Sequence, residues 1–413
     1  MRITAGSKDK PGSCRQCGDA PTAHIPAYIA GTLEAWIADR GIAPPDSVRG
    51  RVSGYVSRVF DVFVDWALDA CCVAGLFRIS TDPEKACSYR SQIVWEEAIA
   101  RGLQMEQLML FGKLTELYRV RQAGTWRYFQ SLPVSADSRR VMYAGLDDKL
   151  KFKQLLKSID IPCPRAECVK NLREARVAFG RLQKPVITKP RIGSRARHTT
   201  TNIREEKDLD SGFRSAQTLC RQVIIEEHIE GGVSRATVVD GRLEGFLQLL
   251  PARVVGDGKH TITELIHTKN KTRPLSVGEV VLDEEHIAYL KRTGYTENSV
   301  IERGKMIDLS RRTGRFEGGA TREILERVHP KLRAYAEKAA KALHAPVVGF
   351  DIIIPDPESD PDTQRWGFLE ANSLPFIDLH YLPLEGKPSP VARAVWDLWD
   401  RSHGLASSAF QRA

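Results

Sequence analysis

The sequence lacks any apolar run that could cross a membrane, since none of its stretches reaches the roughly 18–20 residues that a bilayer requires. Its first residues, MRITAGSKDKPGSCRQ, are polar and contain no apolar core of the kind found in a secretory leader. We therefore expect a cytoplasmic protein with no membrane partner.

Cysteine is scarce, and 8 cysteines in 413 residues exclude a disulfide scaffold. Cys14 and Cys17 form a lone C-x-x-C motif in a segment rich in Gly, Pro and Ser, which is not the setting of a redox motif. A zinc site needs two further ligands; His24 would be a third, and no second C-x-x-C motif follows. Plain thiols are the simpler interpretation and a small zinc site is the alternative. We expect residues 14–24 to be dispensable for chemistry, because the motif lacks a fourth ligand.

The chain carries 61 Lys and Arg against 52 Asp and Glu, a net charge of +9. Such a balance suits nucleic acid or an anionic small molecule. The basic residues are dispersed, with local clusters at 269–273 and 311–315 that no aromatic residues interrupt. We therefore expect a phosphate-rich substrate and no nucleic acid.

The first part of the chain is expected to be α-rich. Apolar residues recur every three or four positions through much of residues 25–103, and Asp82 before Pro83 is a favourable helix start. Residues 113–133 alternate across an Ala-Gly pair and predict a hairpin. No catalytic signature is evident in this part.

The remainder mixes strands and helices without an internal repeat. Residues 147–245 predict an amphipathic helix, then the order strand, loop, helix, strand, and then a hairpin around an Asp-Gly turn. Residues 268–320 are basic, glycine-punctuated and irregular, and 329–344 predict a helix. Residues 346–376 predict a hairpin with a long acidic loop.

Two lysines and a loop predict a phosphate site. Lys149 opens a helix, and Lys189 ends a strand at the mouth of a loop, where a lysine can act as a point charge on phosphate. Lone lysines are more often solvated surface. In the loop that follows, Gly193 allows close backbone approach. The hydroxyls of the loop belong to Ser194, Thr199 and Thr200.

Acidic residues predict two further features. Glu370 and Asn372 share one face of a strand, and the hairpin places Asp351 opposite residue 369 or 370. These oxygen ligands predict a Mg²⁺ site, with Mn²⁺ as the alternative ion. A polar sheet face is disfavoured, because the neighbours are apolar and bare charges there are costly. Three carboxylates also lie close together after the apolar stretch Val-Ile-Ile at 223–225. They are Glu226, Glu227 and Glu230.

Several ordered segments resemble the ATP-grasp domain of the cyanophycin synthetases and of the bifunctional glutathione synthetases. They are DDKLKFKQLL, PVITKP, VIIEEHIEG, PARVVGDGKHTITELI, GFDIIIPD, FLEANSLP and LEGKPSPVA, within about residues 145–400. The resemblance implies an α+β chain with the ATP-grasp fold, in which two lobes clasp ATP after an α-rich N-terminal domain with a hairpin. The expected divisions are a flexible tail at 1–22, the N-terminal domain at 23–145, a central lobe at 146–230, a C-terminal lobe at 231–402 and a tail at 403–413.

The resemblance also implies roles for individual residues. The adenine and ribose of ATP would contact Glu226, Glu227, Ile229 and Glu230. The phosphates would contact Lys149, Lys189, Gly193 and Ser194. The catalytic pair would be Arg235 and Lys189, and the metal ligands would be Asp351, Glu370 and Asn372. The candidate substrate residues are Arg253, Arg311, Arg312 and His380.

These observations predict an ATP-dependent carboxylate–amine ligase that works through an acyl phosphate on an amino acid or small peptide. Its partners would be a small-molecule acid and an amine, and we expect a homo-oligomer, namely a dimer. The alternative is a kinase on the same scaffold that phosphorylates a hydroxyl. A binding module without catalysis is disfavoured by the intact lysine and metal sets. The segment IDLSRRTGRFEGGA departs from the family pattern, so the family's substrate is not carried over.

Overall fold

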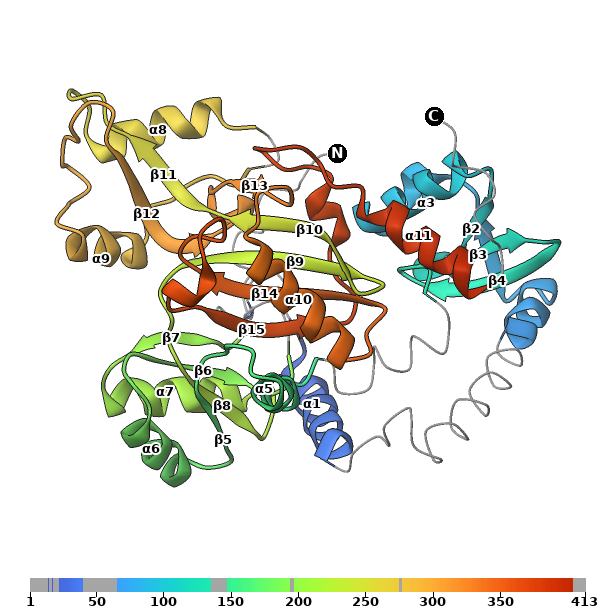
Figure 1. The fold of residues 1–413 in the computed structure, drawn as a ribbon, viewed down its shortest axis with the longest axis horizontal. Coiled ribbons are helices and arrows are strands. Elements are labelled where there is room, and N and C mark those ends of the chain that lie inside the picture. Colours follow the sequence, from blue (N-terminus) through green and yellow to red (C-terminus); the bar gives the residue numbers. More distant parts are fainter. Residues whose placement is uncertain are drawn as a thin grey trace.

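The computed structural model describes residues 14, 17, 22–39, 65–134, 147–193, 197–274 and 277–403. They build a four-stranded N-terminal sheet, a four-stranded central lobe and a five-stranded C-terminal lobe, from which a two-stranded arm projects. Figure 1 shows the arm and the N-terminal sheet on opposite sides of the molecule. In the described residues no helix is long and apolar enough to span a membrane.

The N-terminal sheet is an antiparallel meander in the order β1-β2-β3-β4. Its strands are Phe77–Ser80, Gln104–Leu110, Lys113–Gln122 and Thr125–Gln130. The predicted hairpin is confirmed as β3–β4. It turns at Ala123 and Gly124, which have φ values of 48° and 81°, as a two-residue hairpin turn with two left-handed residues requires. Strands β1 and β2 were not predicted. With them, the N-terminal region is partly helix and partly sheet.

The helix expected after Asp82 begins later than predicted. Pro83–Lys85 forms a single 3-10 turn (η2) that Asp82 caps, and α3 (Tyr89–Ala100) starts behind its own cap, Ser88. The C-terminal helix α11 (Val391–Ser402) packs on α3, and its tryptophans join the aromatic core of the N-terminal sheet. The N-terminal sheet is thereby fastened to the rest of the chain by an apolar core.

The central lobe confirms the predicted order of elements. It consists of α5 (Lys149–Ser158), β5 (Ala166–Val169), α6 (Leu172–Arg181), β6 (Val186–Pro190), β7 (Thr200–Ile203), α7 (Glu206–Gln217) and β8 (Val223–Glu227). The strands are antiparallel in the order β5-β8-β6-β7. Strands β5 and β7 and helix α6 were not predicted. Lys149 opens α5 behind the cap Asp148, as the sequence indicated.

The C-terminal lobe confirms both predicted hairpins. Its elements are β9 (Gly232–Val239), β10 (Arg242–Leu249), β13 (Thr321–Glu323), α10 (Pro330–Ala342), β14 (Val347–Ile354) and β15 (Gly367–Asn372). The sheet order β13-β10-β9-β14-β15 places β9 and β14 at its centre. Asp351 lies opposite Glu370 on β15 and opposite Arg235 on β9. The register therefore brings three charged residues together on the adjacent strands β9, β14 and β15.

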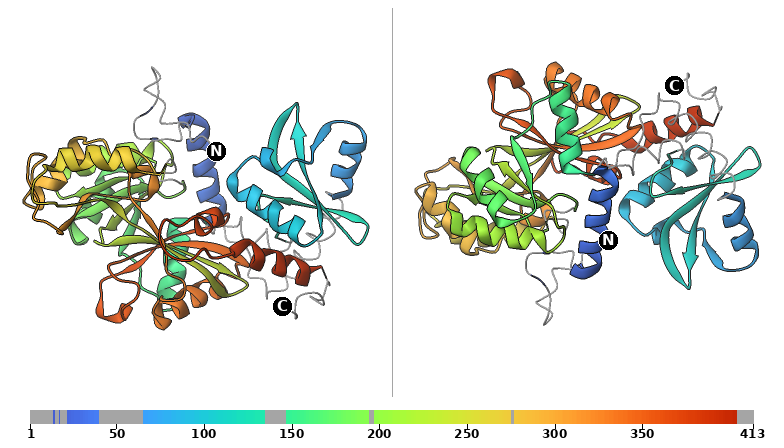
Figure 2. Two further views of the ribbon diagram at one scale, coloured as in Figure 1. Left: turned by 90° about the horizontal axis from the view of Figure 1, so that it is seen from above. Right: turned by 90° about the horizontal axis from the view of Figure 1, so that it is seen from below.

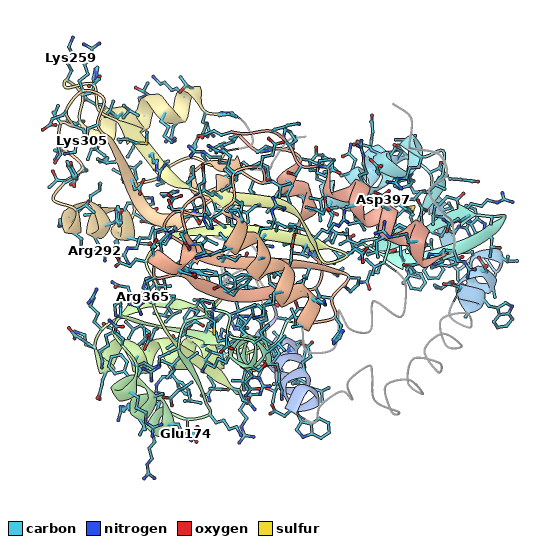
Figure 3. All side chains as sticks on the ribbon, in the orientation of Figure 1. Glu174, Lys259, Arg292, Lys305, Arg365 and Asp397 are labelled. Atoms are coloured by element: carbon cyan, nitrogen blue, oxygen red, sulfur yellow. The ribbon has the colours of Figure 1, made fainter. Side chains whose placement is uncertain are left out.

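The arm corrects the expectation that residues 268–320 are irregular. It consists of β11 (Pro251–Val255), α8 (Ile262–Thr272), α9 (Glu284–Arg292) and β12 (Met306–Thr313) around a small apolar core. Helix α8 starts in a capping box formed by Thr261 and Glu264. Figure 3 shows Lys259 and Lys305 at the outer end of the arm.

Helix α1 (His24–Asp39) lies between the central lobe and the N-terminal sheet in both views of Figure 2. It contacts the central lobe through the pair Asp39–Arg191, with 2.8 Å between oxygen and nitrogen. The expectation that the C-x-x-C motif lacks a fourth ligand is wrong. His198, which precedes β7, lies beside the two cysteines and His24. The sequence could not show this, because the fourth residue is more than 170 positions away from the other three.

Candidate active site

A cleft of about 990 Å³ lies where the central lobe, the C-terminal lobe and the arm meet. Its walls include the end of β6, the residues that follow β8, and the facing parts of β12, β14 and β15. Apolar side chains alternate there with cations and carboxylates. Of the sixteen sequence-predicted site residues, twelve line this cleft: Lys149, Lys189, Gly193, Glu226, Glu227, Ile229, Glu230, Arg253, Arg311, Arg312, Asp351 and Glu370.

The two predicted phosphate lysines both reach this cleft from buried positions. Lys149 Nζ donates a 2.6 Å hydrogen bond to the Gly193 carbonyl and lies 3.3 Å from Glu370 Oε2. Lys189 Nζ donates to Glu226 Oε1 at 3.0 Å. Lys149 thus links the predicted phosphate loop to the predicted metal site. Both are cations held by the protein inside a cleft, rather than solvated surface lysines.

A third lysine, Lys153, was not predicted. It lies one turn after Lys149 on α5, and its Nζ lies 2.7 Å from Glu226 Oε2 in an ion pair without hydrogen-bond geometry. Burial lowers the pKa of Lys153, although Glu226 opposes it. Burial alone would raise the pKa of Glu226, but Lys153 and Lys189 outweigh it and lower that pKa. Its spacing from Lys149 was the one signal available, since residues four apart share a helix face.

The predicted side-chain contact of Glu226 with adenine does not fit this geometry. The Glu226 carboxylate is 1% exposed and faces the two lysines, so its backbone is the part left for a base. The Glu227 carboxylate accepts from the Gln183 amide at 3.0 Å and from Arg365 at 3.2 Å. The two glutamates therefore stabilise the strands and charges around the cleft.

Ile229 and Glu230, which follow the end of β8 by two and three residues, have the contrasting character that a nucleoside needs. Ile229 is a buried apolar residue of the cleft wall. Glu230 is largely exposed, and its Oε1 accepts a 2.8 Å hydrogen bond from Arg311. The Arg311 guanidinium lowers the pKa of Glu230, so its carboxylate is available to accept from hydroxyls.

The candidate metal ligands gather on the β14–β15 ladder. Asp351 pairs with Glu370, and Asn372 lies two residues further along β15, opposite Gly349. Burial raises the pKa of Asp351, and repulsion from Glu370 adds to this. Burial alone would raise the pKa of Glu370, but Lys149 and other cations lower it. Two carboxylates this close repel each other, so a nearby positive charge stabilises their ionised forms.

Arg235 supplies part of that positive charge. Its Nε lies 2.6 Å from Asp351 Oδ1, but neither atom makes a hydrogen bond within the described part of the chain. Its Nη1 is likewise buried without a hydrogen bond there. Buried groups left in this way are costly unless a ligand completes them. The residues therefore fit a divalent cation and an anionic ligand, and oxygen donors such as these suit Mg²⁺.

Two of the predicted substrate arginines are already paired with acids of the arm. Arg253 Nε lies 2.5 Å from Asp308 Oδ1. Arg312 contacts three carboxylates, those of Asp283, Glu285 and Glu317. Arg312 therefore braces β12 against α9, which is a structural role. Arg311, whose single ion-pair partner among the described residues is Glu230 on the cleft wall, is the better candidate for binding a substrate.

The prediction of a substrate role for His380 is wrong. The side chain is fully buried away from the cleft, where Nδ1 lies 2.6 Å from Glu323 Oε2 and Nε2 lies 2.8 Å from Thr237 Oγ1. A Cβ on Gly245 would lie 2.5 Å from the ring, so the backbone of β10 closes over it. His380 therefore links η5 (Ile377–His380) to the sheet.

Two further predicted residues lie outside this lining set. Arg235 and Asn372 sit beside Asp351, on the neighbouring strands. Ser194 lies outside the described residues. Several polar residues of the cleft wall were not predicted, because they belong to no motif in the sequence. They include Arg197, Thr201, Asn202, His228, Arg292 and Ser310.

Known proteins similar to this chain agree with this architecture. The cyanophycin synthetase of Trichormus variabilis is 30% identical over 261 residues, which are 61% of this chain and 29% of that protein. The glutathione biosynthesis bifunctional protein of Clostridium perfringens is 27% identical over 321 residues, 75% of this chain and 40% of the relative. The chain therefore spans less than half the length of these relatives.

The solved structure of a bifunctional glutathione synthetase from Pasteurella multocida shares the fold. Its TM-score is 0.55 at 22% identity, over 76% of this chain and 43% of that one. No family model matches the chain. The two sequence relatives and the shared fold agree with the resemblance seen in the sequence. The chain has the ATP-grasp fold, and its homologues include the cyanophycin synthetases and the bifunctional glutathione biosynthesis proteins.

Proposed function

We propose that the protein is an ATP-dependent carboxylate–amine ligase that forms an amide or peptide bond. The observation that carries the proposal is the group of Lys149, Arg235, Asp351 and Glu370 where the cleft meets the β14–β15 ladder. Two cations and two carboxylates there suit a nucleotide phosphate with its divalent ion. The synthetase names of the relatives support a ligase rather than a kinase.

The binding roles divide along the cleft. The segment 226–230 would hold the adenine and ribose of ATP, and Lys149, Lys189 and Gly193 would hold the phosphates. Asp351, Glu370 and Asn372 would hold Mg²⁺, with Mn²⁺ as the alternative. When bound, the ion supplies positive charge opposite the negative charge of the transferred phosphoryl group.

The reaction requires no protein nucleophile. A carboxylate oxygen of the acid attacks the terminal phosphorus of ATP, the bond from that phosphorus to ADP breaks, and an acyl phosphate forms. The amine nitrogen then attacks the acyl carbon, phosphate leaves, and the nitrogen loses a proton as the amide forms. The Arg235 guanidinium, whose Nη1 is free of hydrogen bonds in the described residues, would stabilise the charge on the moving phosphoryl group.

The acid is proposed to be an amino acid or short peptide with a second carboxylate. Arg311 supports this, because a guanidinium can bind both oxygens of one carboxylate. Its ion pair with Glu230 is partly exposed, so exchange for a substrate carboxylate carries a modest cost. The expected homodimer stays a prediction.

The test is to screen amino acids and dipeptides, alone and in pairs, for release of ADP and phosphate from ATP. A ligase releases phosphate when acid and amine are both present, and mass spectrometry then finds their condensation product. ADP release with a single hydroxyl compound, together with a phosphorylated product and no free phosphate, would instead establish the kinase.

A further inference from the structure

Four metal-binding side chains meet far from the β14–β15 carboxylates. They are Cys14, Cys17, His24 and His198, and their ligand atoms all lie within 4.8 Å of one another. His198 Nε2 lies 3.6 Å from Cys14 Sγ and 3.4 Å from Cys17 Sγ. His24 Nε2 lies 3.4 Å from Cys17 Sγ. Three segments of the chain therefore deliver two sulfurs and two imidazole nitrogens to one point.

These spacings match a tetrahedral zinc site. A zinc ion with Zn–N bonds of about 2.0–2.1 Å and Zn–S bonds of about 2.3 Å places neighbouring ligand atoms about 3.3–3.8 Å apart. All three sulfur–nitrogen distances above fall in that range. Thiol-to-imidazole hydrogen bonds would explain single contacts, but not the convergence of four donors on one centre.

The surroundings of His198 provide an independent observation. Its Nδ1 lies 3.0 Å from the Ser215 carbonyl, a partner that can only accept, so Nδ1 carries the proton and Nε2 presents its lone pair to the cysteines. The imidazole is 3% exposed. Its backbone has φ of 53°, an uncommon conformation for a residue other than glycine. The chain thus holds His198 in an unusual conformation with its free nitrogen aimed at two thiols.

The site connects two parts of the protein. His198 lies between Arg197 and Thr199, which both line the cleft, while its own ring faces away from the cleft toward the cysteines. His24 is the first residue of α1, which also contacts the central lobe through Cys220 Sγ and the Gly31 carbonyl, 3.6 Å apart. A metal here would fix the end of the β6–β7 loop (191–199) to α1.

We propose that Cys14, Cys17, His24 and His198 form a structural zinc site that fastens α1 to the β6–β7 loop. Two thiolates and two imidazoles fill a tetrahedral shell and leave no open position, which is the arrangement of a structural rather than a catalytic zinc. Soft sulfur ligands favour zinc over the magnesium expected at the oxygen-rich cleft. Cys14, Cys17 and His24 would then be needed to hold His198 in its position before β7.

The experiment measures zinc in the full chain, purified from zinc-supplemented cells and dialysed against a weak chelator. We expect about one zinc per chain by elemental mass spectrometry, as the closed four-ligand site requires. Cobalt exchanged into the unaltered protein should give the intense visible bands of tetrahedral thiolate coordination. Both measurements use unaltered protein, so they decide the matter even where a variant fails to fold.

The variants assign the ligands. Cys17→Ser should lose the zinc, and hydrogen exchange should rise in α1 and around His198. Cys220→Ser is the matched control and should keep the zinc. Cys220 is a buried free cysteine that also contacts α1 but is not one of the four proposed ligands. Metal-free unaltered protein, a disulfide between Cys14 and Cys17, or equal zinc in the two variants would each overturn the proposal. None of these measurements depends on ligase activity, so they leave the proposed function to its own test.

Discussion

Asp351 lies directly opposite Glu370 in the β14–β15 ladder, yet the two carboxyl groups have pKa values displaced in opposite directions. Burial and repulsion from Glu370 raise the pKa of Asp351, although the nearby Arg235 opposes this. Burial alone would raise the pKa of Glu370 too, but Lys149 and Lys189 outweigh it. Asp351 is thus the member of the pair that is costly to ionise, and a divalent cation beside it would favour its ionised form.

The first prediction concerns pH and stability without metal. Because the folded state raises the pKa of Asp351, the folded protein binds this proton more tightly than the unfolded chain. The free energy of unfolding should therefore fall as pH rises from about 5 to about 8. The lowered pKa of Glu370 acts in the opposite sense, and its contribution is lost at lower pH, below about 4.5.

Urea unfolding at a series of pH values in a chelator measures this slope. Asp351→Asn should flatten it, and Asp160→Asn, at an exposed turn position, should not. Saturating Mg²⁺ should also flatten it in the unaltered protein, because the ion competes with the proton. Equal slopes for Asp351→Asn and the unaltered protein would show that another group titrates.

The second prediction is that Lys189→Ala impairs nucleotide turnover while the fold survives. Lys189 ends a strand at the cleft, and Lys153 still pairs with Glu226 when it is removed. Loss of one charge-assisted contact costs on the order of 1.5–3 kcal/mol, so kcat/KM for ATP should fall about 10–150-fold. Circular dichroism and ADP release are the measurements. Lys207→Ala, an exposed lysine of α7, is the control, and equal rates in the two variants would refute the assignment.

The sequence predicted the features that follow from short-range periodicity. Strand alternation and the hairpin loop placed Asp351 opposite residue 369 or 370, and the structure has Glu370 there; an Asp-Gly turn was enough to predict β9–β10. The acidic partners of Arg312 and His380, among them Asp283 and Glu323, could not be predicted because they lie far away in sequence. In a sequence, arginines that bind a substrate cannot be distinguished from arginines that stabilise the packing of a helix. Only the three-dimensional contacts distinguish these two roles.

The third prediction follows from the correction at His380. His380→Ala would leave the buried Glu323 carboxylate and the Thr237 hydroxyl without this partner. Leaving a buried hydrogen-bonding group without its partner costs about 1–3 kcal/mol, so the midpoint of urea unfolding should fall. KM values for ATP and acid should stay within about twofold in the folded fraction, since no contact with the cleft is lost. A raised KM with unchanged stability would restore the substrate role.

The last prediction concerns the acid. Arg311 lines the cleft and, among the described residues, pairs with Glu230 alone, whereas its neighbour Arg312 pairs with three carboxylates. Arg311→Ala should therefore raise KM for the acid about 10–150-fold, the cost of one charge-assisted contact, and leave KM for ATP unchanged.

Arg312→Ala is the matched control. Its loss should loosen the contact between β12 and α9 and lower the thermal midpoint without changing KM for the acid. A rise in KM for ATP in Arg311→Ala would mean that Arg311 acts by holding Glu230 beside the ribose. Unchanged KM values for both substrates would mean that the Arg311–Glu230 pair is a solvated ion pair of the rim, and the inference of an acidic substrate would fail with it.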